Sequence, residues 1–272
     1  NMDRNSPEFL IEETNQSLAD TKVWLDTSAQ FGPLVKPIIT PRFVPSCTSE
    51  LMTGLAKLAK EYDVPVQSHL SENHGEIDWV ASLHPESSNY TDVYYEHHLM
   101  GTVPTVMAHC IHLSDVEMDR MAETQTMVSH CPYSNVNLSS GIAPIRKLIE
   151  RNIPIGLGSD ISGGHIVSMA KVLTEAIGLS KMKWAEVDPN YAPLTLSEAF
   201  YMATKGGGQF FGHVGSFEKG YELDALIIDD TSLFDPNERS LEERLERWLY
   251  VGDDRHIIER YVAGRVVPSP KG

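Results

Sequence analysis

The sequence predicts an α/β fold of the (β/α)8 barrel type, and two features of the chain carry this prediction. Short apolar runs alternate with segments of helical periodicity along the 272 residues, as in buried parallel strands joined by helices. A barrel collects its chemistry at the carboxyl ends of many strands, whereas an open doubly wound sheet does so mainly at one switch point. The runs here end in groups that bind metals, protons or anions: Arg42, His69, His109, His130 and Asp160.

The helices and strands are expected in a regular order. A helix over 6–30 is predicted because a Ser-Pro-Glu sequence at 6–8 suits the cap and the first turn. A second helix is predicted over 49–62, where apolar residues recur on one face. The strand-like runs are 35–40, 64–69, 103–109, 126–130 and 153–157. After residue 205 the pattern changes, and 223–228 and 261–267 are expected as strands of a small β layer.

The composition excludes several classes of protein. Hydrophobic residues make up 41% and charged residues 22%, which is usual for a folded globular chain. With 22 Lys and Arg against 38 Asp and Glu, the formal net charge of −16 disfavours binding to nucleic acid or to an anionic membrane. No apolar run approaches the roughly 20 residues that span a bilayer. The three cysteines form no CxxC pair, so we expect a reducing compartment, the cytoplasm.

A histidine and a glutamate three residues apart follow one of the apolar runs. His69 ends the run and Glu72 lies just beyond it. This spacing suits a metal ligand beside a general acid or base, because the two groups can be close without both binding the metal. The pattern H-x-x-E is common by itself, and its position at a strand end is what favours a functional role.

Two further strand ends add candidate groups. Asp160 closes the run at 156–160, and a carboxylate there is costly unless it is paired or bound to a metal. His109 taken alone is better explained as a buried core histidine. Together with His69 and Glu72, these residues outline a mononuclear metal site with mixed nitrogen and oxygen ligands, which suits Zn²⁺, or Fe²⁺ as second choice.

An arginine next to an aromatic residue marks a candidate substrate site. Arg42 and Phe43 follow Pro41 at an early strand end. The forked guanidinium and the ring suit a planar, polar substrate bound at its edge and at its face. Taken alone, these two residues are better explained as a surface ion pair beside an ordinary packing residue.

Several motifs resemble the amidohydrolase superfamily. The segments 67–73, 106–109, 129–135 and 156–160 look like its fifth to eighth barrel strands. Three more specific segments, Thr-Pro-Arg-Phe at 40–43, Leu-Ser-Ser-Gly at 138–141 and Trp-Leu-Tyr-Val-Gly-Asp-Asp-Arg at 248–255, are similar to the guanine deaminases within that superfamily. The resemblance extends over essentially the whole chain.

The resemblance implies a role for each candidate residue. His69 and Asp160 would ligate zinc, Glu72 would shuttle protons, and His109 would hydrogen-bond the water or the reaction intermediate, so that Glu72, His109 and Asp160 form the catalytic set. Arg42 and Phe43 would bind the guanine ring. The implied reaction is hydrolytic and converts guanine and water to xanthine and ammonia. The resemblance also implies a homodimer.

One departure from the family pattern concerns the metal. The family takes two further zinc ligands from an H-x-H motif on its first barrel strand, and none of the 11 histidines here forms H-x-H. We therefore expect an incomplete barrel that holds only the later strands, the C-terminal portion of such an enzyme, inactive by itself. Residues 1–205 are expected to form the partial metal-dependent hydrolase barrel. Residues 206–272 are expected to add the remaining helices and the C-terminal strands of a small β domain.

Two other functions stay open at this point. One is a different amidohydrolase that acts on another ring amine or on a ring halide. The other is a barrel relative without catalysis that serves as a binding or assembly subunit, for which the loss of H-x-H is the characteristic sign.

Overall fold

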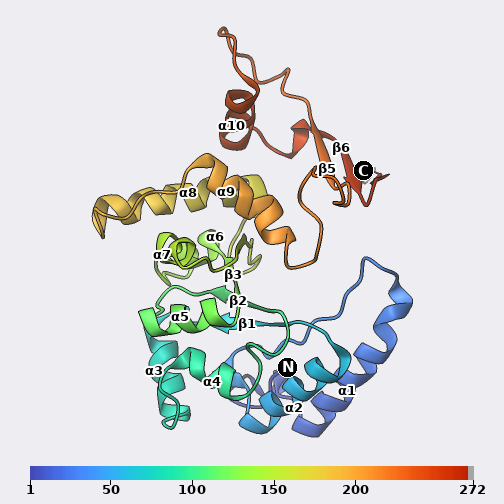
Figure 1. The fold of residues 1–272 in the computed structure, drawn as a ribbon, viewed down its shortest axis with the longest axis vertical. Coiled ribbons are helices and arrows are strands. Elements are labelled where there is room, and N and C mark those ends of the chain that lie inside the picture. The colour runs from blue at the N-terminus through green and yellow to red at the C-terminus, as the bar shows by residue number, and fades with distance from the viewer. Residues whose placement is uncertain (269–272) are drawn as a thin grey trace. The chain divides into compact units, whose positions relative to one another are not determined.

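The computed structural model describes residues 1–268, which form two compact units. Unit 1 comprises residues 1–130 and 143–154, and unit 2 comprises 131–142 and the chain from 155 onward. The strands of unit 1 are β1 (Val66–Leu70), β2 (Thr105–His109) and β3 (Met127–His130) (Figure 1). Its helices are α1 (Thr14–Ser28), α2 (Ser49–Tyr62), α3 (His74–Leu83), α4 (Tyr90–Glu96), α5 (Asp115–Glu123) and α7 (Ile145–Glu150).

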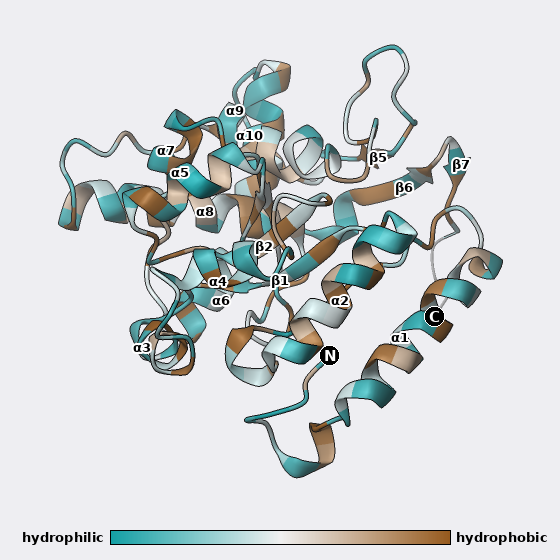
Figure 2. Cartoon of the chain, turned by 60° about the horizontal axis from the view of Figure 1, so that its bottom comes forward, coloured by the Kyte–Doolittle hydropathy of each residue, from teal (hydrophilic) through white to brown (hydrophobic). Residues whose placement is uncertain are grey.

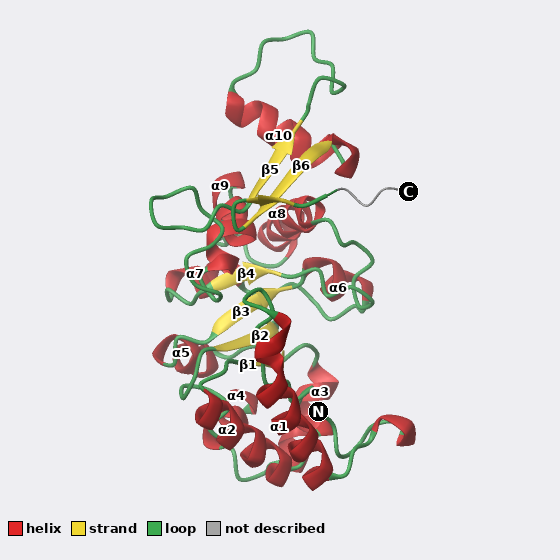
Figure 3. Cartoon of the chain, turned by 90° about the vertical axis from the view of Figure 1, so that its right-hand side faces the viewer, coloured by secondary structure: helices red, strands yellow, loops and turns green. Residues whose placement is uncertain are grey.

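The strands of unit 1 form a parallel sheet in the order β1-β2-β3, with β2 between its neighbours (Figure 3). In the register of β1 and β2, His69 lies opposite Ala108 and Leu70 lies opposite His109. The strands are short, and Leu70, Met107 and Val128 are fully buried. The predicted α/β class with parallel strands is confirmed in this unit. The incomplete barrel that the sequence predicts, with its later strands only, stays a prediction.

The helix expected over 6–30 is shorter than predicted. Helix α1 begins at Thr14, where the Glu13 side chain accepts the N–H of Gln16, and a 3-10 turn occupies Glu8–Leu10. Backbone contacts of the preceding residues explain the late start, because the N–H of Glu12 bonds to the carbonyl of Met2. Apolar and polar residues are mixed along α1 (Figure 2). Leu25 is its one buried large apolar residue, which is why periodicity placed its ends poorly.

The strand expected over 35–40 is wrong in extent. Only Ile39 pairs with the sheet, through a parallel bridge to Val66. Pro37 and Pro41 flank this residue and have no N–H to donate, so the ladder cannot extend in either direction. By contrast, the helix predicted over 49–62 is confirmed as α2, capped at its start by the Thr48 hydroxyl.

Unit 2 contains two long helices and a small antiparallel sheet. Its helices are α6 (Pro132–Asn137), α8 (Met169–Glu186), α9 (Leu196–Tyr201) and α10 (Leu241–Val251), and a π-helical turn covers Met202–Gly206. Strand β4 (Ile155–Leu157) precedes α8. Strands β5 (Ala225–Ile228), β6 (Ile257–Val262) and β7 (Arg265–Val266) form an antiparallel sheet in that order.

The strand predicted over 261–267 is instead a hairpin. It contains the end of β6, a turn at Ala263 and Gly264, and β7. Both turn residues have positive φ, which the tight turns of hairpins require. The strand predicted over 223–228 is confirmed as β5. The expected domain boundary after residue 205 stays a prediction. Within residues 1–268, no helix is both long enough and apolar enough to cross a bilayer.

Candidate active site

The imidazole of His69 is held in one tautomer by the backbone. Its Nδ1 atom lies 2.6 Å from the carbonyl oxygen of Arg42. A carbonyl oxygen only accepts hydrogen bonds, so Nδ1 carries the proton and the lone pair is on Nε2. The N–H of His69 bonds to the same oxygen at 3.3 Å, which fixes strand and ring together. This is the arrangement in which a histidine offers Nε2 to a metal.

Glu72 and His109 lie next to each other in unit 1. The Oε2 atom of Glu72 is 3.7 Å from Nε2 of His109, and the rings of His109 and His69 stack with centroids 5.4 Å apart. His109 is 1% exposed and the Glu72 side chain 17%, so this carboxylate is largely shielded from solvent. The structure therefore brings three of the predicted site residues together at the carboxyl ends of β1 and β2.

A third histidine lies at the end of β3. His130 is 2% exposed, and its Nδ1 atom has no hydrogen-bond partner. Burial, and secondarily the nearby His109, lower the pKa of His130 to about 3. The ring is therefore neutral at any pH near 7.

Arg42 and Phe43 form an exposed cation and ring pair. The guanidinium carbon of Arg42 lies 5.3 Å from the centroid of the Phe43 ring. Phe43 in turn meets Trp79 edge-on at a centroid distance of 6.3 Å. Arg42 is exposed and Phe43 is half-buried. The guanidinium thus remains available to a planar ligand while the ring is fixed from behind.

Asp160 belongs to unit 2 and is built by a tight turn after β4. Its carbonyl accepts the N–H of Gly164, and Ile161 bridges to Gly164. A β-carbon on Gly163 would lie 2.6 Å from the Asp160 Oδ2 atom and 2.7 Å from the Ser134 Oγ atom. Glycine at 163 is therefore what leaves room for this carboxylate.

Left-handed backbone occurs at or just after three of the five predicted strand ends. Ser71 follows β1 with φ 49°, His109 ends β2 with φ 70°, and Asp160 follows β4 with φ 43°. Such conformations cost non-glycine residues of order 1–3 kcal/mol and cluster at functional sites. They support the strand ends as the place of the chemistry.

Sequence reasoning missed a set of residues behind this site. Glu76 is 7% exposed and its carboxylate accepts the N–H of Glu72 at 2.8 Å. The hydroxyl of Tyr90 donates to Glu76 at 2.7 Å, and that of Tyr94 donates to the carbonyl of His69 at 2.8 Å. The capping pattern Asn73-x-x-Glu76 was the available signal for Glu76.

Within residues 1–268, no three His, Cys, Asp or Glu side chains gather into a metal cluster. His69, with its lone pair on Nε2, and Asp160, in the space left by Gly163, are each suitable as single ligands. They belong to different units. The metal set and the catalytic set therefore stay predictions.

Comparisons with known proteins agree with these motifs. The chain matches the amidohydrolase family over residues 4–267. It is 44% identical to the guanine deaminase of Dictyostelium discoideum, over 98% of this chain and 60% of that protein. The structure of guanine deaminase from C. acetobutylicum with bound guanine in the active site has a TM-score of 0.95 and 52% identity, covering 98% of this chain and 64% of that one.

A more distant structure shares the fold. Atrazine chlorohydrolase from Arthrobacter aurescens TC1, complexed with zinc, has a TM-score of 0.82 over 96% of this chain and 57% of that one. At 19% identity, this likeness shows the fold alone.

The chain spans 60 to 64% of the length of the two guanine deaminases compared above. The resemblance to amidohydrolases, and to the guanine deaminases among them, is confirmed by these matches. The chain belongs to the amidohydrolase family.

Proposed function

We propose that this chain takes part in the hydrolytic deamination of guanine to xanthine and ammonia. The observation that carries the proposal is the cluster of His69, Glu72 and His109, in which a shielded carboxylate lies beside two histidines. Similarity to guanine deaminases over 98% of the chain supports guanine as the substrate. Arg42 and Phe43 would bind the purine, the guanidinium at a polar edge and the ring at a face.

Glu72 would carry the protons of the reaction. It accepts a proton from the attacking water and delivers it to a ring nitrogen of guanine, while the carbon–oxygen bond forms at the amino-bearing carbon. The carbon–nitrogen bond then breaks, and ammonia leaves with the second proton of that water. The position of Glu72 next to His109 suits this role, because Nε2 of His109 can stabilise the oxygen of the tetrahedral species.

His69 and Asp160 would be two of the ligands of a zinc ion. The protonated Nδ1 of His69 and the space beside Asp160 fit this assignment. In such sites zinc would lower the pKa of a bound water from 15.7 to about 7. The remaining ligands, an H-x-H pair, would come from outside these 272 residues.

The expected compartment and oligomeric state follow from the same resemblance. We expect the cytoplasm, a reducing compartment that suits the buried thiols of Cys47, Cys110 and Cys131, which are in no disulfide. We expect a homodimer, which the mass measured by light scattering tests.

Complementation tests the proposed function. The 272-residue chain is assayed alone, and also fused to the part of the C. acetobutylicum guanine deaminase that the match leaves uncovered. Xanthine formation from guanine and zinc per chain are measured for both. We expect tight zinc binding and turnover in the fusion and only weak zinc binding in the chain alone.

Other outcomes decide against the proposal. A folded, zinc-loaded fusion that is inactive on guanine but active on another ring amine or a ring halide would assign a different amidohydrolase reaction. A folded fusion without activity on the whole panel would favour a binding subunit. Full guanine turnover by the chain alone would show that another residue completes the site.

A further inference from the structure

We propose that two stacked tyrosines on helix α4 are positioning residues with separate tasks. Tyr90 fixes the loop of Glu72, and Tyr94 fixes the strand end that carries His69. This inference rests on the proposed function and deepens it, because it assigns the support of the proton carrier and the support of the metal ligand to different side chains. The two rings stack with centroids 5.7 Å apart at an interplanar angle of 14°.

The first branch runs from Tyr90 through Glu76 to Glu72. The Tyr90 hydroxyl donates to Oε1 of Glu76 at 2.7 Å. The other oxygen, Oε2, accepts the N–H groups of Glu72 at 2.8 Å and of Asn73 at 3.3 Å. Tyr90 is 2% exposed, and burial raises its pKa well above the ordinary value, so the hydroxyl keeps its proton and donates. The backbone N–H of Glu72 is thus bonded to the buried carboxylate of Glu76, and the hydroxyl of Tyr90 holds that carboxylate in place.

The second branch runs from Tyr94 to β1. The Tyr94 hydroxyl donates to the carbonyl of His69 at 2.8 Å and lies 2.7 Å from the Ser68 hydroxyl. Ser68 in turn bonds to the carbonyl of Pro41 at 2.7 Å. This branch joins the segment of Arg42 to the strand that bears His69. It does not pass through Glu76, whose Oε1 atom accepts the hydroxyl of Tyr90 at 2.7 Å. The Tyr90 hydroxyl also lies 3.5 Å from the His69 carbonyl, a much longer contact than the 2.8 Å of Tyr94, so Tyr94 is the main support of that carbonyl.

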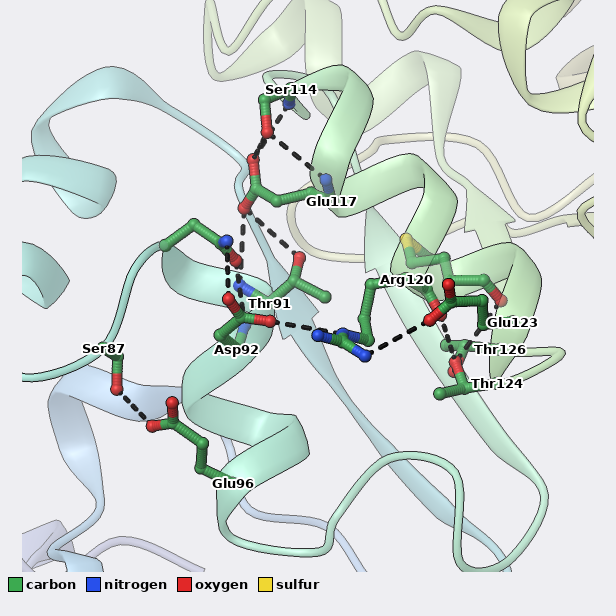
Figure 4. Close-up of polar contacts among 12 residues, drawn as sticks. Ser87, Thr91, Asp92, Glu96, Ser114, Glu117, Arg120, Glu123, Thr124 and Thr126 are labelled. Atoms are coloured by element: carbon green, nitrogen blue, oxygen red, sulfur yellow. Dashed lines mark hydrogen bonds and ion pairs between the residues drawn. The ribbon is translucent and has the colours of Figure 1, made fainter.

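Helix α4 is itself held from α5, as Figure 4 shows. Glu117, which is 6% exposed, accepts the N–H of Thr91 at 3.3 Å and its hydroxyl at 3.2 Å. Asp92 pairs with Arg120 at 3.3 Å. A helix anchored in this way is a rigid base for Tyr90 and Tyr94. The distances from their hydroxyls to the site are therefore set by packing and not by flexible side chains.

The test compares Tyr90→Phe with Tyr94→Phe in the active fusion. Each change removes one hydroxyl and keeps the ring stack. We expect Tyr90→Phe to lower kcat about 10-fold and to shift the acid limb of the pH profile, with zinc affinity unchanged within about twofold. We expect Tyr94→Phe to weaken zinc binding about 10-fold, measured by competition with a chelator. The zinc measurement also applies to the 272-residue chain and needs no turnover.

Tyr95→Phe is the matched control, because Tyr95 lies on the same helix, is 40% exposed and contacts Arg120. It should leave both quantities unchanged. Thermal unfolding of every variant separates loss of fold from loss of position.

Equal losses of kcat and zinc affinity in both tyrosine variants would indicate a merely structural role and overturn the inference. The inference would also be overturned if neither Tyr90→Phe nor Tyr94→Phe changed kcat or zinc affinity in an enzyme that Glu72→Gln inactivates. Full turnover by Glu72→Gln would instead contradict the proposed function.

Discussion

Nδ1 of His69 and the carbonyl oxygen of Arg42 are 2.6 Å apart, so the backbone of the proposed guanine-binding residue sets the tautomer of the proposed zinc ligand. The link uses main-chain atoms of Arg42 and leaves its guanidinium free for other contacts. The proposed substrate contact and the proposed support of the metal ligand therefore depend on different atoms of one residue. A side-chain substitution at position 42 should separate them.

Arg42→Lys should weaken guanine binding without changing zinc affinity. Lysine keeps the charge but loses the planar fork of donors, and a lost hydrogen bond to a charged group costs about 1.5–3 kcal/mol, or roughly 10- to 100-fold in KM. Steady-state kinetics on guanine and a zinc titration check this. Arg244→Lys is the control, because it makes the same change at a guanidinium that binds the Asp230 carboxylate in unit 2. An unchanged KM for the Arg42 variant would make Arg42 structural.

Glu72→Gln should abolish turnover and leave zinc content nearly intact. Glutamine keeps the shape of the side chain and the backbone bond from position 72 to Glu76, but it cannot carry a proton. Loss of general acid–base catalysis typically lowers the rate by about 10²- to 10⁴-fold. Xanthine formation and metal analysis of the same sample test the loss of turnover and the retention of zinc.

Glu50→Gln, a change at an exposed glutamate on α2, is the control for the loss of one negative charge. If zinc is lost together with activity in Glu72→Gln, Glu72 is a ligand and not a proton carrier.

The sequence predicted the positions of the strand ends better than it predicted the contacts that hold the site residues in place there. Apolar runs that end in histidine identified β1, β2 and β3, because a buried parallel strand needs continuous apolar residues. The run at 35–40 looked the same, yet the prolines limit it to one bridge. Apolar content therefore indicates burial, and available N–H groups decide whether a ladder forms.

The contacts behind the site could not be predicted from the sequence for a different reason. Tyr90 reaches Glu76, 14 residues away, only through the packing of α4, and no local pattern around Tyr90 specifies that contact. The burial of His130 without a partner for Nδ1 is likewise a tertiary property. The assignment of Arg42, Phe43 and Asp160 to guanine and zinc came from the resemblance, since the residues alone favoured a surface ion pair at Arg42.

The protein should lose stability as the pH falls below about 7, because of His130. Burial, and then His109, hold its pKa at about 3 in the folded protein, whereas an unfolded chain binds the proton at about 6.5. Between these values the unfolded state binds more protons, so acid favours unfolding. From pH 7.5 to pH 5 this linkage costs about 2 kcal/mol. Urea unfolding at several pH values should show that His130→Gln removes this part of the slope, and an unchanged slope would contradict a neutral, buried ring.

Gly163→Ala should weaken zinc binding by displacing Asp160. The new methyl group would lie 2.6 Å from Oδ2 of Asp160 and 2.7 Å from Oγ of Ser134, both far below contact distance. Both atoms end short side chains, so these side chains move before the backbone does, and a displaced ligand loses affinity by about 10-fold or more. Overpacking of this kind also destabilises by about 1–3 kcal/mol.

Gly178→Ala is the matched control for this change. Gly178 lies within α8 with no atom within 4 Å of the added methyl, and alanine stabilises a helix interior by about 1 kcal/mol relative to glycine. Chelator competition and thermal unfolding on both variants separate the local effect from the general one. If Gly163→Ala moves only the unfolding temperature while zinc affinity matches that of Gly178→Ala, the Asp160 carboxylate is not a ligand. If zinc affinity falls in Gly163→Ala alone, the space that this glycine leaves is what lets Asp160 reach the metal.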